Sequence, residues 1–174
     1  MIKGGLIMNE IVIKVHPMDI ELLKYVYAIG CNDLEIEFET FLKCRDSVFV
    51  VVNKDTSDLH NPIVDGIVAC CRTTAEECDI STLDFYPTPY KVIYEIKICN
   101  IIQNSNSDFS DILSSILNTV SVDKNDAFII LRYYQSEIND EIKCAFLKCG
   151  YKLYNQDNKC ITFVKQPTLI GFNT

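Results

Sequence analysis

The last third of the chain constrains the fold most, because it alternates strong strand and helix patterns within a short length. Residues 126–134 form an apolar run that predicts a strand, and residues 140–148 have the spacing of a short amphipathic helix. The residues K-C-G-Y follow at 148–151, and residues 160–165 predict a final strand. A strand, a helix and a second strand in this order predict that the chain ends in a mixed α/β unit.

The first two thirds of the chain predict a hairpin-joined, mostly antiparallel sheet with helices around it. Alternating and β-branched runs predict strands, and apolar residues at helical spacing predict helices, the first of which Asp19 can cap. A turn at Asp65-Gly66 would lead into the third strand. The predicted strands are residues 11–15, 48–53, 67–72 and 91–102, and the predicted helices are residues 19–28, 33–43 and 111–120.

Length and composition predict one domain without a membrane-spanning segment. The chain has 174 residues, of which 48% are hydrophobic and 23% charged, so it can bury a single core. We expect residues 1–174 to form this domain; its folded part can start at Met8, and residues 1–8 can be flexible. No run approaches the ~20 apolar residues of a membrane span, and the first residues lack the apolar run of a signal peptide. We therefore expect a cytoplasmic protein with no membrane partner.

Charge, cysteine content and histidine content argue against nucleic-acid binding, a disulfide framework and a metal site. The net charge of −8 argues against a nucleic-acid partner, for which a basic face supplies most of the affinity. The nine cysteines are odd in number and form no C-x-x-C pair, which argues against a disulfide framework and a zinc site. We expect a reducing compartment, with Cys144, Cys149 and Cys160 as small core residues. His16 and His60 are the only histidines, too few for a metal site, so no metal is expected.

Two motifs in the last third resemble a known superfamily. The residues F-I-I-L at 128–131 and A-F-L-K-C-G-Y at 145–151 resemble the closing strand and helix of the GCN5-related N-acetyltransferases (GNAT superfamily). Within it the chain looks most like the glucosamine-6-phosphate N-acetyltransferases, whose ending pairs K-I-I-L with F-Y-x-K-C-G-F. The resemblance covers about residues 11–165. It implies a mixed, mostly antiparallel sheet with a splayed central strand pair, flanked by about four helices.

The resemblance implies acetyl-CoA as co-substrate and places its binding site. The pantetheine arm would bond the backbone of the central strand at Ile96 and Ile98, and the pyrophosphate would bind the next loop and the positive N-terminus of the following helix. Asn106 and Asp108 stand where the family has glycines, and the Asp108 carboxylate would repel a pyrophosphate. These loop residues can equally form a polar turn with Asp108 or Ser110 as N-cap. The predicted cofactor-binding loop residues are Gln103, Asn104, Ser105, Asn106, Ser107 and Asp108.

The catalytic residues that the resemblance implies include one departure from the family. The tyrosine that protonates the leaving thiolate falls at Phe146, which cannot donate a proton. Tyr133, Tyr134, Tyr151 or a water would have to replace it. Glu95, in the middle of the central strand, could collect the proton of the amine through a water, with a pKa raised by the desolvation that a bound cofactor would bring. It could equally point to solvent.

For the acceptor, Arg132 and Lys97 are the candidate ligands of a phosphate, because guanidinium and ammonium groups bind phosphate well. The resemblance therefore implies an acetyl-CoA-dependent N-acetyltransferase for a small amine, with glucosamine 6-phosphate, an amino-sugar metabolite, as the best-fitting acceptor. Two alternatives stay open. One is a GNAT-fold binding or dimerisation module without catalysis, which the missing glycines and tyrosine favour. The other is a protein N-acetyltransferase, which would need an open peptide groove. A homodimer is compatible with each of these functions.

Overall fold

The centre of the computed structural model is a seven-stranded sheet in the order β1-β2-β3-β4-β5-β7-β6. Every neighbouring pair is antiparallel except β4 and β5, which are parallel. The structure describes residues 10–31, 34–53, 63–74, 76–78, 92–102, 108–134 and 138–168. The strands are β1 (Glu10–Lys14), β2 (Val48–Asn53), β3 (Val64–Thr73), β4 (Ile93–Ile101), β5 (Phe128–Tyr134), β6 (Lys152–Gln156) and β7 (Cys160–Lys165). The predicted mixed, mostly antiparallel α/β class is confirmed.

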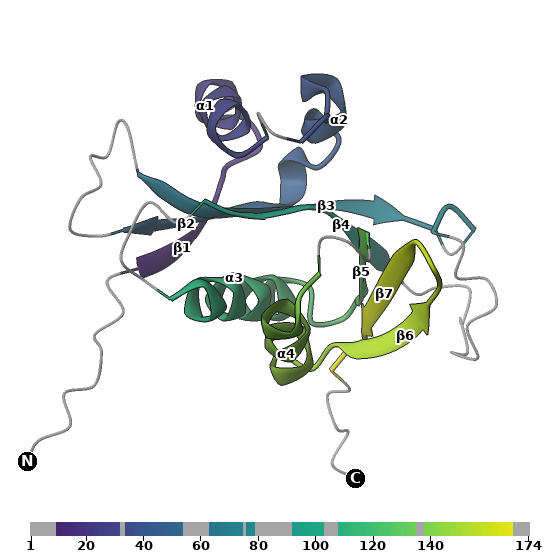
Figure 1. Ribbon diagram of the computed structural model, residues 1–174. Coiled ribbons are helices and arrows are strands. Elements are labelled where there is room, and N and C mark those ends of the chain that lie inside the picture. The colour runs from purple at the N-terminus through teal and green to yellow at the C-terminus, as the bar shows by residue number, and fades with distance from the viewer. Residues whose placement is uncertain are drawn as a thin grey trace, which may run out of the picture.

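Helices cover both faces of the sheet (Figure 1). On one face lie α1 (Ile20–Gly30) and α2 (Phe38–Leu42), followed by a 3₁₀ helix, η1 (Arg45–Ser47). On the other face lie α3 (Phe109–Asp123) and α4 (Asp140–Lys148). Each face has its own buried apolar core. Because the two cores use alternate residues of the same strands, β2 and β3 are buried along most of their length.

The first helix is capped at its start and fixed to the sheet at its end. The Asp19 side chain accepts a hydrogen bond from the Leu22 N–H at 3.0 Å, as predicted for an N-cap. At the other end, a Cβ on Gly30 would collide with the Ile67 side chain of β3, so any larger residue would force that side chain to move. The Asn100 amide of β4 donates to the Gly30 carbonyl at 2.9 Å. The residues that follow α1 are thereby placed over β4.

The structure differs from the prediction in two predicted elements and one strand that was not predicted. The helix expected over 33–43 is wrong in its first half: Glu37 is extended, and the Tyr27 hydroxyl donates to the Ile36 carbonyl at 2.6 Å, so a side chain replaces the helical bond. The turn expected at Asp65-Gly66 is also wrong, because both residues lie within β3, although the predicted β2–β3 hairpin is confirmed. Strand β6 was not predicted, because its largely exposed residues carry no alternating apolar pattern.

The cysteines depart from the sequence-based prediction in two places. Cys44 and Cys71, 27 residues apart, form a disulfide with Cα atoms 4.6 Å apart. Residue count and spacing, which argue against a disulfide framework, do not predict this single pair, since they do not show that the start of η1 packs against β3. Cys149 is buried as expected and Cys160 is half-buried, but Cys144 lies exposed on α4.

Two negative findings apply to the described part of the chain. No helix there is both long and apolar enough to cross a membrane. Nor do those residues contain a group of three or more His, Cys, Asp or Glu side chains that could hold a metal ion.

Candidate functional site

The sheet opens between its two parallel strands. β4 and β5 pair from Ile93↔Phe128 to Ile96↔Leu131, and in the described residues their ladder ends there although both strands continue. On its other side β4 stays paired with β3 as far as Ile101. A bulge explains the divergence: Ala69 and Cys70 of β3 pair with Ile98 and Ile96, so that Lys97 is an extra residue in β4. The predicted splay of the central strands is therefore present, and it leaves one backbone edge of β4 open.

A cavity of about 590 Å³ lies at this splay. It is lined by residues 96–99 of β4, residues 131–133 of β5 and residues 34–36 of the α1–α2 connection. This volume is in the usual range of small-molecule sites. The predicted site residues Ile96, Ile98, Lys97, Arg132 and Tyr133 all contribute to the lining.

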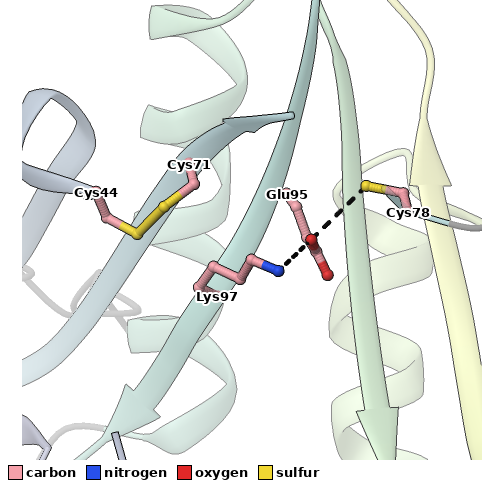
Figure 2. Close-up of a disulfide and its surroundings, with 5 residues drawn as sticks. All are labelled: Cys44, Cys71, Cys78, Glu95 and Lys97. Atoms are coloured by element: carbon pink, nitrogen blue, oxygen red, sulfur yellow. Dashed lines mark hydrogen bonds and ion pairs between the residues drawn. A yellow bond between two sulfur atoms is a disulfide. The ribbon is translucent and has the colours of Figure 1, made fainter. Parts of the chain in front are cut away.

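Glu95 lies behind this wall and is surrounded by hydrogen-bond donors. Arg132 donates to its Oε1 from Nε at 2.9 Å and from Nη2 at 2.6 Å. Lys97 Nζ lies 2.5 Å from its Oε2, and the Cys78 thiol donates to the same oxygen at 3.6 Å. Figure 2 shows Lys97 and Cys78 reaching the carboxylate from opposite sides. We call Glu95, Lys97, Arg132 and Cys78 the Glu95 cluster.

The residues around Glu95 lower its pKa. Burial acts to raise the pKa of Glu95, but the hydrogen bonds and charges of Lys97 and Arg132 outweigh burial and lower it. The raised pKa that we expect once a bound cofactor desolvates the carboxylate stays a prediction, and these two cations act against it. With both oxygens engaged and its pKa lowered, Glu95 stays ionised near neutral pH and is a poor acceptor for the proton of an amine.

Tyr133 lies between the cavity and the position where the superfamily has its acid. Its hydroxyl donates to the Cys99 carbonyl across the splay at 3.4 Å, and its ring centroid is 5.7 Å from that of Phe146. Phe146 is fully buried, packed against Tyr151 and Phe163. Burial also raises the pKa of Tyr151 well above its usual value, and Tyr151 does not line the cavity. Tyr134 belongs to β5, but its side chain lies outside the described residues.

Of the predicted pyrophosphate loop, the structure describes Asp108. Gln103, Asn104, Ser105, Asn106 and Ser107 lie outside the described residues. Asp108 is described and is the N-cap of α3, where its carboxylate accepts a hydrogen bond from the Ser110 N–H at 2.8 Å. The N-cap alternative is thus confirmed for Asp108, and its carboxylate is engaged with the first turn of its own helix.

Sequence reasoning did not identify two parts of the site. Residues 34–36, including Glu35, line the cavity, but they were predicted as helix and so were not considered as site residues. Cys78 lies within residues 73–89, between the predicted strands 67–72 and 91–102, where the irregular sequence predicts a long loop. Loops of that length are often functional, but nothing in the sequence marks Cys78 itself.

Solved structures with the same architecture are acetyltransferases. NAA60 of Arabidopsis thaliana, in complex with a bisubstrate analogue, has a TM-score of 0.64 at 15% identity over 90% of this chain and 98% of that chain. The polyamine N-acetyltransferase of Drosophila melanogaster has a TM-score of 0.61 at 13% identity over 90% and 99% of the two chains. A GNAT-family acetyltransferase from Bacillus cereus has a TM-score of 0.59 at 12% identity over 91% and 98%.

This chain has the GNAT fold. At these identities the likeness establishes the fold alone. No protein-family model matches the sequence, and no curated protein matches it.

Proposed function

We propose that the protein transfers the acetyl group of acetyl-CoA to a primary amine. The observation that carries this proposal is the cavity at the splay of β4 from β5, in a chain with the GNAT fold. Acetyl-CoA would supply a thioester whose carbonyl carbon the amine attacks. The chain would supply the surface that binds both reactants and the groups that move protons.

The described residues fit an acetyl-CoA molecule at this place. The open edge of β4 beyond Ile96 offers backbone N–H and C=O groups to the amides of a pantetheine arm. The N-terminus of α3, a 15-residue helix that follows β4, provides the partial positive charge that favours a pyrophosphate. The Asp108 carboxylate, which accepts a hydrogen bond from the Ser110 N–H, uses part of this positive charge, so this helix terminus favours a pyrophosphate less than one with a neutral N-cap would.

Tyr133 is the candidate acid for the leaving thiolate. It is a predicted catalytic residue, it lines the cavity, and its ring touches that of Phe146, where the superfamily's tyrosine is missing. Glu95 is better suited to orient Lys97 and Arg132 than to accept a proton. The proton of the attacking amine would therefore pass to water in the cavity, and Tyr134 stays a second candidate for proton transfer.

The acceptor is a narrower proposal. Glucosamine 6-phosphate, the sequence-based choice, gains support from Lys97 and Arg132 at the cavity wall but from none of the solved structures reported above. The Drosophila melanogaster structure is described as a polyamine N-acetyltransferase. The Arabidopsis thaliana structure was determined with a bisubstrate analogue. Small amines are therefore acceptors to test beside the amino sugar. Peptide N-termini are tested as well, because the sequence left a protein N-acetyltransferase open as an alternative.

A binding module without catalysis is the second candidate, and Phe146 favours it. A fully buried phenylalanine in place of the family's tyrosine removes the usual acid. The two candidates differ in turnover but share cofactor binding.

The test measures acetyl-CoA binding by calorimetry and thermal shift, with free adenosine as the control ligand, and then thiol release with a panel of amines. A rise in melting temperature reports binding, because a ligand bound only by the native state raises stability. Binding together with amine-dependent thiol release supports the enzyme. Binding without release by any amine supports the module. Absence of binding overturns both.

A further inference from the structure

The Glu95 cluster presents positive charge to the cavity and keeps its negative charge behind the wall. Lys97 and Arg132 line the cavity, whereas Glu95 does not. The side chain of Glu95 is only 6% exposed, against 42% for Lys97 and 33% for Arg132. The carboxylate therefore compensates the cations from the protein side and leaves their other side open.

The hydrogen-bond donors of the two cations are only partly used. Glu95 accepts two N–H groups from Arg132 and one from Lys97. An arginine has five N–H donors and a lysine has three. Among the described residues, no further hydrogen bond or ion pair engages either cation, so within that part of the chain about three donors of Arg132 and two of Lys97 have no acceptor.

The charge balance of the cluster also favours the binding of an anion. Glu95 carries one negative charge and its two partners carry two positive charges, so the cluster has a net charge of about +1, in a chain whose net charge is −8. Two cations next to each other at one wall would repel, and the buried carboxylate between them offsets that repulsion and fixes their positions. The result is a local positive patch formed by Lys97 and Arg132, with two carboxylates near it: Glu35 lines the same cavity, and the charge of Glu77 interacts with that of Lys97.

We propose that Lys97 and Arg132 bind an oxyanion of the acceptor, a carboxylate or a phosphate, while its amine reacts, and that Glu95 is the positioning residue for both cations. This inference rests on the proposed acetyl transfer and adds the substrate class: amines that also carry an anionic group. Glu35, which also lines the cavity, offers a negative charge to the ammonium end of such an acceptor.

The experiment compares matched amines that differ in the anionic group: 4-aminobutyrate with butylamine, and glucosamine 6-phosphate with glucosamine. The parent protein should have the lower KM for the anionic member of at least one pair. Lys97→Met, which leaves the Arg132–Glu95 pair in place, should raise that KM roughly tenfold or more, since a hydrogen bond to a charged group is worth about 1.5–3 kcal/mol. KM for the neutral member should change far less.

The variant Glu95→Gln tests whether Glu95 positions Lys97 and Arg132 for the anionic acceptor or only stabilises the fold. It should raise KM for the anionic acceptor more than KM for the neutral member of the same pair, whereas a general loss of structure would affect both members alike. Glu35→Gln is the matched control, and it should raise KM for both members of a pair alike. Calorimetry of glucosamine 6-phosphate against glucosamine, without acetyl-CoA, gives a readout that does not depend on turnover.

The outcomes separate the two proposals. Turnover of anionic and neutral amines with equal KM, changed equally by Lys97→Met, overturns the oxyanion site and leaves the acetyltransferase standing. Selective binding of glucosamine 6-phosphate that Lys97→Met abolishes supports the oxyanion site even if no amine is acetylated, and then only the acetyl transfer fails. Absence of both selective binding and acetyl-CoA binding overturns both.

Discussion

At the scale of single residues, Tyr133 carries a hydroxyl at the cavity beside Phe146, which has none. If Tyr133 protonates the leaving thiolate, Tyr133→Phe should lower kcat by ~10²–10⁴-fold, the usual contribution of a positioned acid. KM for acetyl-CoA should change little, because the ring stays in place. Steady-state thiol release checks this, with Tyr154→Phe on β6 as the control. Unchanged kcat in Tyr133→Phe would assign the proton to Tyr134 or water.

Because Phe146 is buried, we expect Phe146→Tyr, which restores the superfamily's tyrosine, to affect stability rather than kcat. Phe146 has no exposed surface and packs against the rings of Tyr133, Tyr151 and Phe163. Phe146→Tyr would place a hydroxyl in this apolar cluster, at a cost of about 1–3 kcal/mol if it finds no partner. We expect a lower midpoint in urea denaturation and no gain in kcat. A rise in kcat would mean that the new hydroxyl reaches the cavity.

At the scale of elements, the sequence predicted best the strands and helices that carry their own periodicity. β2, β7 and α4 match their predicted bounds, because continuous β-branched runs and an amphipathic spacing mark them. The first half of the 33–43 helix failed because a tertiary hydrogen bond from Tyr27 to Ile36 replaces the local pattern. β6 failed because an exposed edge strand needs no apolar face.

The Cys44–Cys71 disulfide joins the end of α2 to β3, and the α1–α2 connection lines the cavity. It closes a chain segment of 27 residues, for which a cross-link typically adds about 2–4 kcal/mol to the free energy of unfolding. The double variant Cys44→Ser/Cys71→Ser should lose stability of that order in denaturant melts. Dithiothreitol should destabilise the parent protein but not the double variant.

Cys144→Ser is the control for this change, because Cys144 is an exposed free cysteine on α4. Its melting curve should match that of the parent protein with and without dithiothreitol. If the double variant also melts like the parent, the two thiols do not pair in solution.

At the scale of the whole molecule, the site combines segments that only the fold brings together. Its strand residues, such as Glu95 and Arg132, could be selected from the sequence because they follow recognisable strand patterns. Their mutual pairing could not, because 37 residues separate them and the parallel register of β4 and β5 sets the contact. The contacts of Cys78 and Glu35 could not be predicted either, because they depend on packing between segments that are distant in the sequence.

This pairing across the sheet makes the stability of the whole molecule depend on pH. Lys97 and Arg132 lower the pKa of Glu95 in the folded state against the effect of burial, so the unfolded chain takes up a proton first on acidification. The stabilisation from Glu95 is therefore fully present above its unfolded pKa of 4.5 and is lost as the pH falls through the folded pKa. Asp123, whose pKa Lys14 and Lys124 lower against the effect of burial, adds a loss of the same sign.

Glu95→Gln should therefore destabilise the protein at pH 7, and the difference from the parent should shrink below pH 4.5, where the parent carboxylate also becomes neutral. Removing one partner of a fully buried ion pair costs about 3–5 kcal/mol. We expect less here, because the side chains of Lys97 and Arg132 are 42% and 33% exposed. Urea denaturation at pH 7 and pH 3 measures the difference.

Glu21→Gln is the control for this change, because it breaks an exposed pair with Lys24. It should change stability by only a few tenths of a kcal/mol at either pH. A Glu95→Gln difference that persists undiminished at pH 3 would mean that the side chain stabilises the sheet by packing and hydrogen bonding rather than by its charge.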